Sequence, residues 1–214
     1  MQRAMEGVGL DRAGFLSLSA RGSASAALGA MTAGLLVDNA VAAPSKAVAS
    51  EPLAEIDLAL ARLAVGAEIL AVEFYTEAIA AKQFSGDAIK YFKRALFNEQ
   101  EHLAAMSQVL SGAGQTPSTA DDFTITFPKG TFDSRGSIAK FGVALETAFV
   151  GAYLGAVDSA AASDLKTTAA RIAASEAQHL SVFSDRAANR PVGISFPAPI
   201  DYATVSDLLD AYLS

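Results

Sequence analysis

The sequence predicts an all-α four-helix bundle, made of two antiparallel helix hairpins and a short C-terminal helix. The chain has 214 residues, is 51% hydrophobic, is rich in Ala and contains no Cys. Hydrophobic residues recur at helical spacing in four long stretches. Short polar turns join the first stretch to the second and the third to the fourth, which favours two hairpins. About 25 residues without helical spacing separate the hairpins, which is enough to cross the bundle.

The N-terminal 43 residues are predicted to be an export signal or a disordered segment, and residues 50–214 to be one domain. Three arginines precede or interrupt the weakly apolar stretch "GSASAALGAMTAGLLV", and small residues follow near Ala42 and Ala43, as at a cleavage site. The stretch is shorter than the roughly 20 apolar residues of a membrane span. "DRAGFLSLS" resembles a twin-arginine signal, but Ala13 stands where a second Arg is expected. We therefore expect an exported, periplasmic or extracytoplasmic protein without stable membrane insertion.

The helical stretches follow one another in a simple order. The turn "FSGD" separates the first two, and "AASD" separates the last two. After them, the prolines of "NRPVGISFPAPIDY" predict an extended tail, and "VSDLLDAYL" predicts a closing helix. The predicted long helices cover residues 52–83, 87–110, 138–161 and 164–188.

Each long helix places one Glu on its apolar face. A helix turns 100° per residue, so position in the sequence decides the face. In the second helix, Glu99 lies among Phe92, Leu103 and Met106, whereas Glu101 lies on the opposite, charged side. The same reasoning places three further acids inward, one on each remaining helix: Glu68, Glu146 and Glu176.

Both histidines of the chain extend this pattern. His102 follows Glu99 by three residues and His179 follows Glu176 by three, so each imidazole lies one turn from an inward acid. Each hairpin thus supplies Glu from its first helix and Glu-x-x-His from its second. Four buried carboxylates repel one another and are costly without compensation. Two metal ions bound by hard oxygens and neutral imidazoles would compensate them.

Plainer interpretations apply to the single residues. A lone inward His is more often a hydrogen-bonded core residue, and a lone inward Glu can line a cavity. Tyr75 and Tyr153 each follow an inward Glu by seven residues, and either pack in the core or donate to ligand carboxylates. Acids on the outer faces are interpreted as solvated charges: Glu73, Glu77 and Glu101.

Composition excludes several classes of partner and site. The net charge of −7 comes without an acidic run, and no basic patch is visible, so nucleic acid is not an expected partner. Without Cys there is no disulfide, no zinc–thiolate site and no thiol nucleophile.

Five segments carry a resemblance to a known family. "AEILAVEFY", "NEQEHLAAM", "FTITFPKGTF", "LETAFVGAYLGA" and "SEAQHLSVF" are similar, in this order, to segments of exported ferritin-like domain proteins, which include desiccation-related proteins. These belong to the ferritin-like di-iron carboxylate superfamily, and the resemblance covers residues 53–213. It implies a ferritin-like bundle in which Glu99 and Glu176 bridge the metals and take the catalytic role. The implied metal ligands are Glu68, Glu99, His102, Glu146, Glu176 and His179.

The expected function is dinuclear metal binding with Fe(II) oxidation by O₂ or peroxide, in the ferroxidase sense. Two iron ions are the expected cofactor, with manganese as the alternative. A manganese catalase-like peroxide dismutase uses a similar carboxylate set, and a non-catalytic stress protein that sequesters metal is a third possibility. Metal ions and O₂ or peroxide are the expected partners, and a homo-oligomer is left open.

Overall fold

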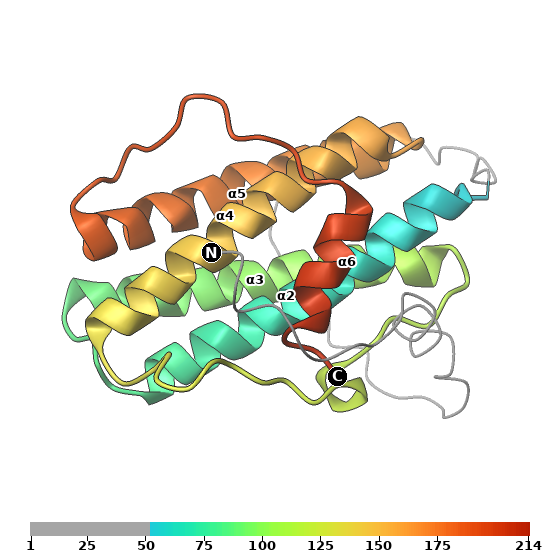
Figure 1. Ribbon diagram of the computed structural model, residues 1–214. Helices are drawn as coiled ribbons and strands as arrows, with labels where there is room; N and C mark the ends of the chain where they lie inside the picture. Colours follow the sequence, from blue (N-terminus) through green and yellow to red (C-terminus); the bar gives the residue numbers. More distant parts are fainter. Residues whose placement is uncertain (1–51) are drawn as a thin grey trace, which may run out of the picture.

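Four long helices run alongside one another in the computed structural model, which describes residues 52–214 (Figure 1). α2 packs against α3 and α4 against α5, which confirms the two predicted hairpins. The predicted export signal lies outside the described residues. The long helices are α2 (Glu55–Ala80), α3 (Asp87–Gly112), α4 (Arg135–Ser159) and α5 (Ser163–Ala188), and shorter ones are the 3-10 helix η1 (Ala120–Asp122) and α6 (Tyr202–Asp210).

Local capping fixes the start of the second hairpin. The Ser134 hydroxyl accepts a hydrogen bond from the backbone N–H of Ser137, so α4 begins at Arg135 rather than near residue 138 as predicted. At the other end of the hairpin, Asp57 accepts hydrogen bonds from the backbone N–H groups of Ala161 and Ala162, at 2.7 and 3.1 Å. This buried carboxylate ties the α4–α5 turn to α2, a contact that the sequence analysis did not find.

The crossover between the hairpins is held by aromatic residues and by the C-terminus. The ring of Phe74 in α2 lies 6.3 Å from that of Phe127 and 6.0 Å from that of Phe132, both in the crossover. Ile125 forms an isolated antiparallel bridge with Leu213. The crossover therefore packs along the bundle and reaches α4 in a defined position.

The tail after α5 crosses α4 before α6 packs over α2 and α4 (Figure 1). The backbone N–H of Ile200 donates to the carbonyl of Gly151 at 2.8 Å. A Cβ atom at Gly155 would lie 1.9 Å from the carbonyl oxygen of Ile200. Two glycines of α4 thus allow the tail backbone to lie directly against the helix.

Gly155→Ala is expected to destabilise the protein by about 1–3 kcal/mol, because its methyl group must push the tail backbone away. Gly112, at the end of α3, is the matched control, because a Cβ atom there would meet no atom within 4 Å. Gly112→Ala should leave stability unchanged or raise it by up to about 1 kcal/mol. Urea unfolding of the two variants measures the difference, and equal stabilities would show that the tail does not rest on α4.

The core consists of two hydrophobic clusters with a polar layer between them. Along α3, one cluster reaches Leu96 and the other begins at Leu103. Along α5, one cluster ends at Ala173 and the other includes Phe183. The intervening turns carry the Glu-x-x-His segments. On α3 and α5 the two clusters are therefore separated by a polar layer in mid-bundle.

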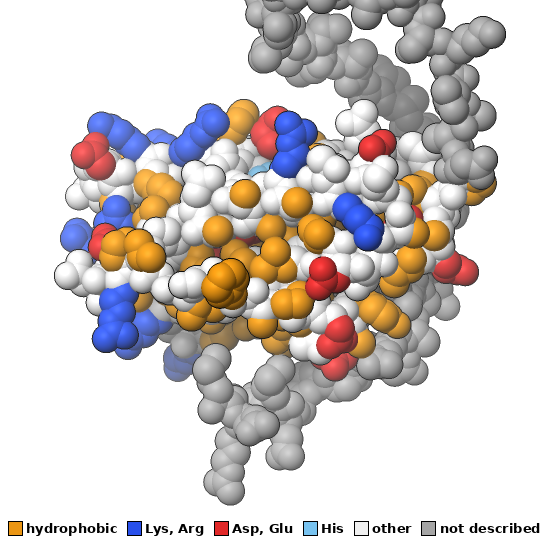
Figure 2. All heavy atoms as spheres, turned by 90° about the horizontal axis from the view of Figure 1, so that it is seen from above, with side chains coloured by type: hydrophobic (Ala, Val, Ile, Leu, Met, Phe, Trp, Pro, Cys, Tyr) orange, Lys and Arg blue, Asp and Glu red, His pale blue; other side chains and the backbone are white. Residues whose placement is uncertain are grey.

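Charged and hydrophobic side chains are unevenly distributed on the face that Figure 2 shows. Figure 2 shows the face seen from above in Figure 1, with Lys and Arg gathered mainly toward one end and hydrophobic side chains over the middle. Among the described helices, α4 alone is long and apolar enough to cross a membrane. It is also a core helix, because Ile138, Leu145 and Phe149 are buried in the bundle.

Candidate metal centre

Four carboxylates meet in the polar layer, one from each long helix. Glu68 of α2, Glu99 of α3, Glu146 of α4 and Glu176 of α5 are all 0% exposed. The structure thus places all four predicted inward acids in the core. Glu101 is exposed, as its position on the charged face of α3 predicts.

His102 faces three of these carboxylates. Its Nδ1 lies 3.2 Å from Oε2 of Glu99, one turn earlier on α3, and 2.9 Å from Oε1 of Glu176 on α5. Oε2 of Glu68 lies further away, at 3.7 Å. The imidazole therefore meets acids from both hairpins.

His179 repeats this arrangement from the other hairpin. Its Nδ1 lies 2.9 Å from Oε2 of Glu176 on its own helix and 2.8 Å from Oε1 of Glu99. Oε2 of Glu146 lies at 3.9 Å. The internal symmetry predicted from the sequence thus appears as two similar sets of contacts.

The ligand atoms form two overlapping groups, each suited to hold one metal ion. One group contains Glu68 and His102, the other contains Glu146 and His179, and both contain Glu99 and Glu176. Within each group the ligand atoms lie within 4.8 Å of one another. In both Glu99 and Glu176, one carboxylate oxygen lies near Nδ1 of His102 and the other lies near Nδ1 of His179. A carboxylate that bridges two metal ions requires this arrangement.

Two tyrosines fix the outer carboxylates, and each tyrosine serves the Glu of the opposite hairpin. The Tyr75 hydroxyl of α2 donates to Oε1 of Glu146 at 2.5 Å. The Tyr153 hydroxyl of α4 donates to Oε1 of Glu68. In both acids this contact engages one oxygen and leaves Oε2 for the centre.

Burial and mutual contacts shift the pKa values of the site. Burial, together with the charges of neighbouring carboxylates, raises the pKa of Glu68 and Glu146 well above the ordinary value. Burial also acts to raise the pKa of Glu176, but hydrogen bonds with His102 and His179 outweigh it and lower the pKa to about 2. In the metal-free protein, protons on the carboxyl groups and the positive charges of the imidazoles therefore offset the negative charge of the cluster.

The imidazoles show the complementary shifts. Burial acts to lower the pKa of His102, but hydrogen bonds to Glu176, Glu68 and Glu99 outweigh it and raise the pKa to about 12. For His179, burial again acts to lower the pKa, but hydrogen bonds to Glu176 and Glu99 outweigh it and raise the pKa to about 9. Metal binding must displace the proton from each Nδ1, because only the neutral imidazole offers a lone pair.

Each of the four Glu has a buried oxygen whose negative charge a bound cation would compensate. Within residues 52–214, one oxygen of each Glu has no hydrogen-bond partner apart from the nearby imidazole Nδ1 atoms: Glu68 Oε2, Glu99 Oε1, Glu146 Oε2 and Glu176 Oε1. Buried polar atoms are otherwise almost always paired, and leaving them unpaired is costly. Over the same residues, the ion pairs of these four carboxylates are all with the two imidazoles. Two metal ions fit this arrangement of hard oxygens and imidazole nitrogens.

Some polar groups near the centre were missed from the sequence. The side-chain amide of Asn98 lies 3.1 Å from Nε2 of His179 and so orients that ring. The Tyr91 ring lies 6.4 Å from the His179 ring, and burial raises the pKa of Tyr91. Neither residue belongs to the Glu-x-x-His repeat, so spacing alone gave no signal for them.

The fold and the centre together define a class: a four-helix bundle with a buried carboxylate–imidazole cluster between its hairpins that could hold metal ions. Di-iron and di-manganese carboxylate bundles have the same ligand set, which is one Glu from each of two helices and Glu-x-x-His from each of the other two. The family profile of the ferritin-like domain matches residues 56–188. The chain belongs to this ferritin-like family. A comparison with curated protein sequences finds no match.

Proposed function

We propose that the protein binds two metal ions per chain and oxidises Fe(II). The observation that supports the proposal is the pair of overlapping ligand groups that share Glu99 and Glu176. Metals bound side by side can accept electrons from, or deliver them to, one oxygen species. The resemblance to exported ferritin-like domain proteins favours iron over manganese.

The residues of the chain have separate roles in this proposal. Glu99 and Glu176 would be shared by both metal ions, and each remaining Glu–His pair would complete one of the two ligand groups. The Tyr75 and Tyr153 hydroxyls hold the Oε1 atoms of Glu146 and Glu68, so that each acid presents Oε2. The buried hydrophobic clusters on either side keep bulk water out of the layer.

The overall reaction balances without a further cofactor. Two Fe(II) ions each give one electron to dioxygen, which takes up two protons and leaves as hydrogen peroxide. With peroxide as the oxidant, the same two electrons and two protons give two water molecules. In metal-free protein, the proposed ligands Glu68, Glu146 and the two imidazoles have raised pKa values, so they release protons when metal binds.

Anaerobic titration of metal-free protein with Fe(II) is expected to saturate near two equivalents per chain. Each ligand group holds one ion, and neither group is complete without the shared carboxylates. Calorimetry or a competing iron chelator measures the endpoint. A sharp endpoint at one equivalent, or no saturable binding, would contradict the dinuclear site.

Admission of oxygen to the loaded protein separates the proposed chemistry from its alternatives. Rapid oxidation of Fe(II), faster than in buffer, supports ferroxidase activity. Dioxygen release from peroxide by manganese-loaded protein, without Fe(II) oxidation by the iron form, would favour a catalase-like reaction instead. Neither reaction, with tight binding of metal, would favour sequestration.

We also propose that the protein acts outside the cytoplasm, from the export pattern of residues 1–43. N-terminal sequencing of native material should then give a mature chain beginning near Ala43. Recovery of soluble cytoplasmic protein that begins at Met1 or Gln2 would overturn this.

A further inference from the structure

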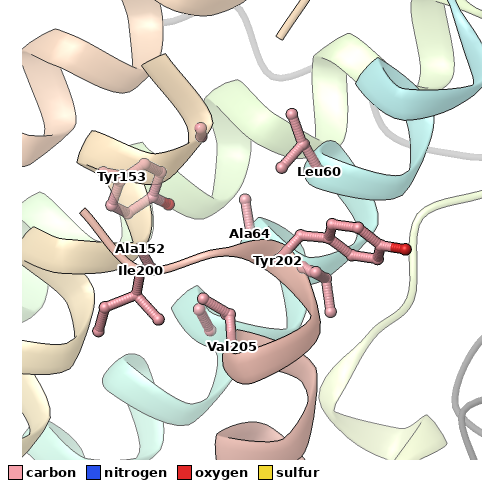
Figure 3. Close-up of a pocket in the computed structure, with 10 residues that line it drawn as sticks. Leu60, Ala64, Ala152, Tyr153, Ile200, Tyr202 and Val205 are labelled. Carbon is pink, nitrogen blue, oxygen red and sulfur yellow. The ribbon is translucent and has the colours of Figure 1, made fainter. Parts of the chain in front are cut away.

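An apolar cavity lies between α2, α4 and α6, next to the candidate metal centre (Figure 3). Its volume is about 30 Å³, which exceeds the roughly 10–15 Å³ that one water-sized molecule needs. Leu60 and Ala64 of α2 face Ala152 and Ala156 of α4 across it, and Val205 of α6 closes one side. The cavity is therefore large enough for a small molecule and lined almost entirely by carbon.

The polar atoms of the lining are engaged or turned away. The Tyr153 hydroxyl donates to Glu68, and the Tyr202 hydroxyl points away from the other labelled side chains in Figure 3. A water molecule needs two to four polar partners, which this lining does not offer, whereas apolar cavities bind apolar gases such as xenon. The chemistry of the lining thus selects a small apolar molecule over water or an ion.

The position of the cavity connects it to the centre. The Tyr153 ring forms part of the wall, and its hydroxyl contacts Glu68 of the first ligand group. Ala67, the neighbour of Glu68 in α2, also lines the cavity. On the outer side the cavity is partly open to solvent, because Ile200 is only half buried and Tyr202 is 45% exposed.

We propose that this cavity is a binding site for dioxygen on its way to the metal centre. The proposal rests on the proposed Fe(II) oxidation, for which dioxygen is the apolar substrate. The tail and α6 form the outer wall of the site. The close packing of Ile200 on Gly151 and Gly155 therefore helps to shape the cavity.

Xenon, an apolar gas atom, tests the cavity without any reaction. Crystals of the native chain under xenon pressure should show a xenon atom among Leu60, Ala64 and Ala156. Ordered water at this place, or no xenon, would overturn the proposal. In Ala156→Leu the larger side chain fills the space, so xenon should be lost, and Ala64→Val is a less bulky variant with the same expected result.

Oxidation rates then test the route. Ala156→Leu should bind Fe(II) as the native chain does but oxidise it several-fold more slowly with dioxygen. Ala144→Leu, at an exposed position of the same helix, is the control and should keep the native rate. Equal rates in Ala156→Leu and the native chain would overturn the route while leaving Fe(II) oxidation intact. No oxidation by the native chain would overturn the route together with the proposed function, and the xenon result alone then decides whether the cavity binds an apolar gas.

Discussion

Glu99→Ala is expected to abolish binding of the metal pair. The substitution removes a carboxylate that both ligand groups share, and whose two oxygens lie 3.2 and 2.8 Å from the Nδ1 atoms of His102 and His179. Loss of even an outer partner of a metal ligand typically weakens metal binding by about 10–100-fold. We therefore expect at least this loss for both ions, together with loss of Fe(II) oxidation.

Glu101→Ala is the matched control, because it removes a carboxylate from the same turn of the same helix. Glu101 is exposed, so its charge contributes at most a few tenths of a kcal/mol to stability. Metal binding should stay at its native stoichiometry and affinity. Calorimetric titration of both variants measures the contrast, and equal losses in the two would refute the assignment of the α3 faces.

The second large effect is the dependence of metal-free stability on pH. Glu68 and Glu146 have folded-state pKa values raised above 4.5, so the folded chain keeps protons that the unfolded chain has released. The imidazoles act in the same direction, because the pKa of His179 is raised from 6.5 to about 9 and that of His102 to about 12. The stability of the metal-free protein should therefore fall as pH rises from about 5 to 9.

Glu176 acts in the opposite direction but in a different window. Its folded-state pKa is lowered from 4.5 to about 2, so its contribution is present above pH 4.5 and is lost as pH falls toward 2. The stability of the metal-free protein should thus pass through a maximum near pH 4.5, because it falls both at lower pH and at higher pH. Urea unfolding at a series of pH values measures this curve.

Metal should reverse the loss at high pH, because cations replace the protons. At a free metal concentration about 1,000 times the dissociation constant, binding adds about 4 kcal/mol. For a chain of this size that raises the melting temperature by roughly 8–16 °C. The gain should grow between pH 5 and 8. No shift at neutral pH, or a shift that shrinks steadily with rising pH, would show that these acids do not form a buried metal site.

Much of the fold was predictable because each long helix has its own hydrophobic face. The ends were less certain: capping by Ser134 starts α4 three residues before the predicted beginning near residue 138. The extended tail was expected from its prolines, but not where it packs. Its contact with α4 depends on Gly151 and Gly155. A glycine in a helix indicates that another segment can pack closely there, but the sequence does not show which segment that is.

The carboxylate–imidazole cluster was predictable because helical spacing fixes faces and the two hairpins repeat one pattern. The partners of Tyr75 and Tyr153 were not. Spacing places each tyrosine near the layer, but only the packing of α2 against α4 decides that each donates to the acid of the other hairpin. Asn98 meets His179 across α3 and α5, a contact between two helices that no single-helix periodicity encodes.

The central claim is that two metal ions occupy the layer between the hairpins. Anomalous diffraction from crystals of iron- or manganese-loaded protein tests it most directly, because it locates the ions and identifies the element. We expect two peaks per chain, one beside Nδ1 of His102 and one beside Nδ1 of His179, with Glu99 and Glu176 contacting both. A single peak, or peaks only at surface acids such as Glu101, would contradict the account.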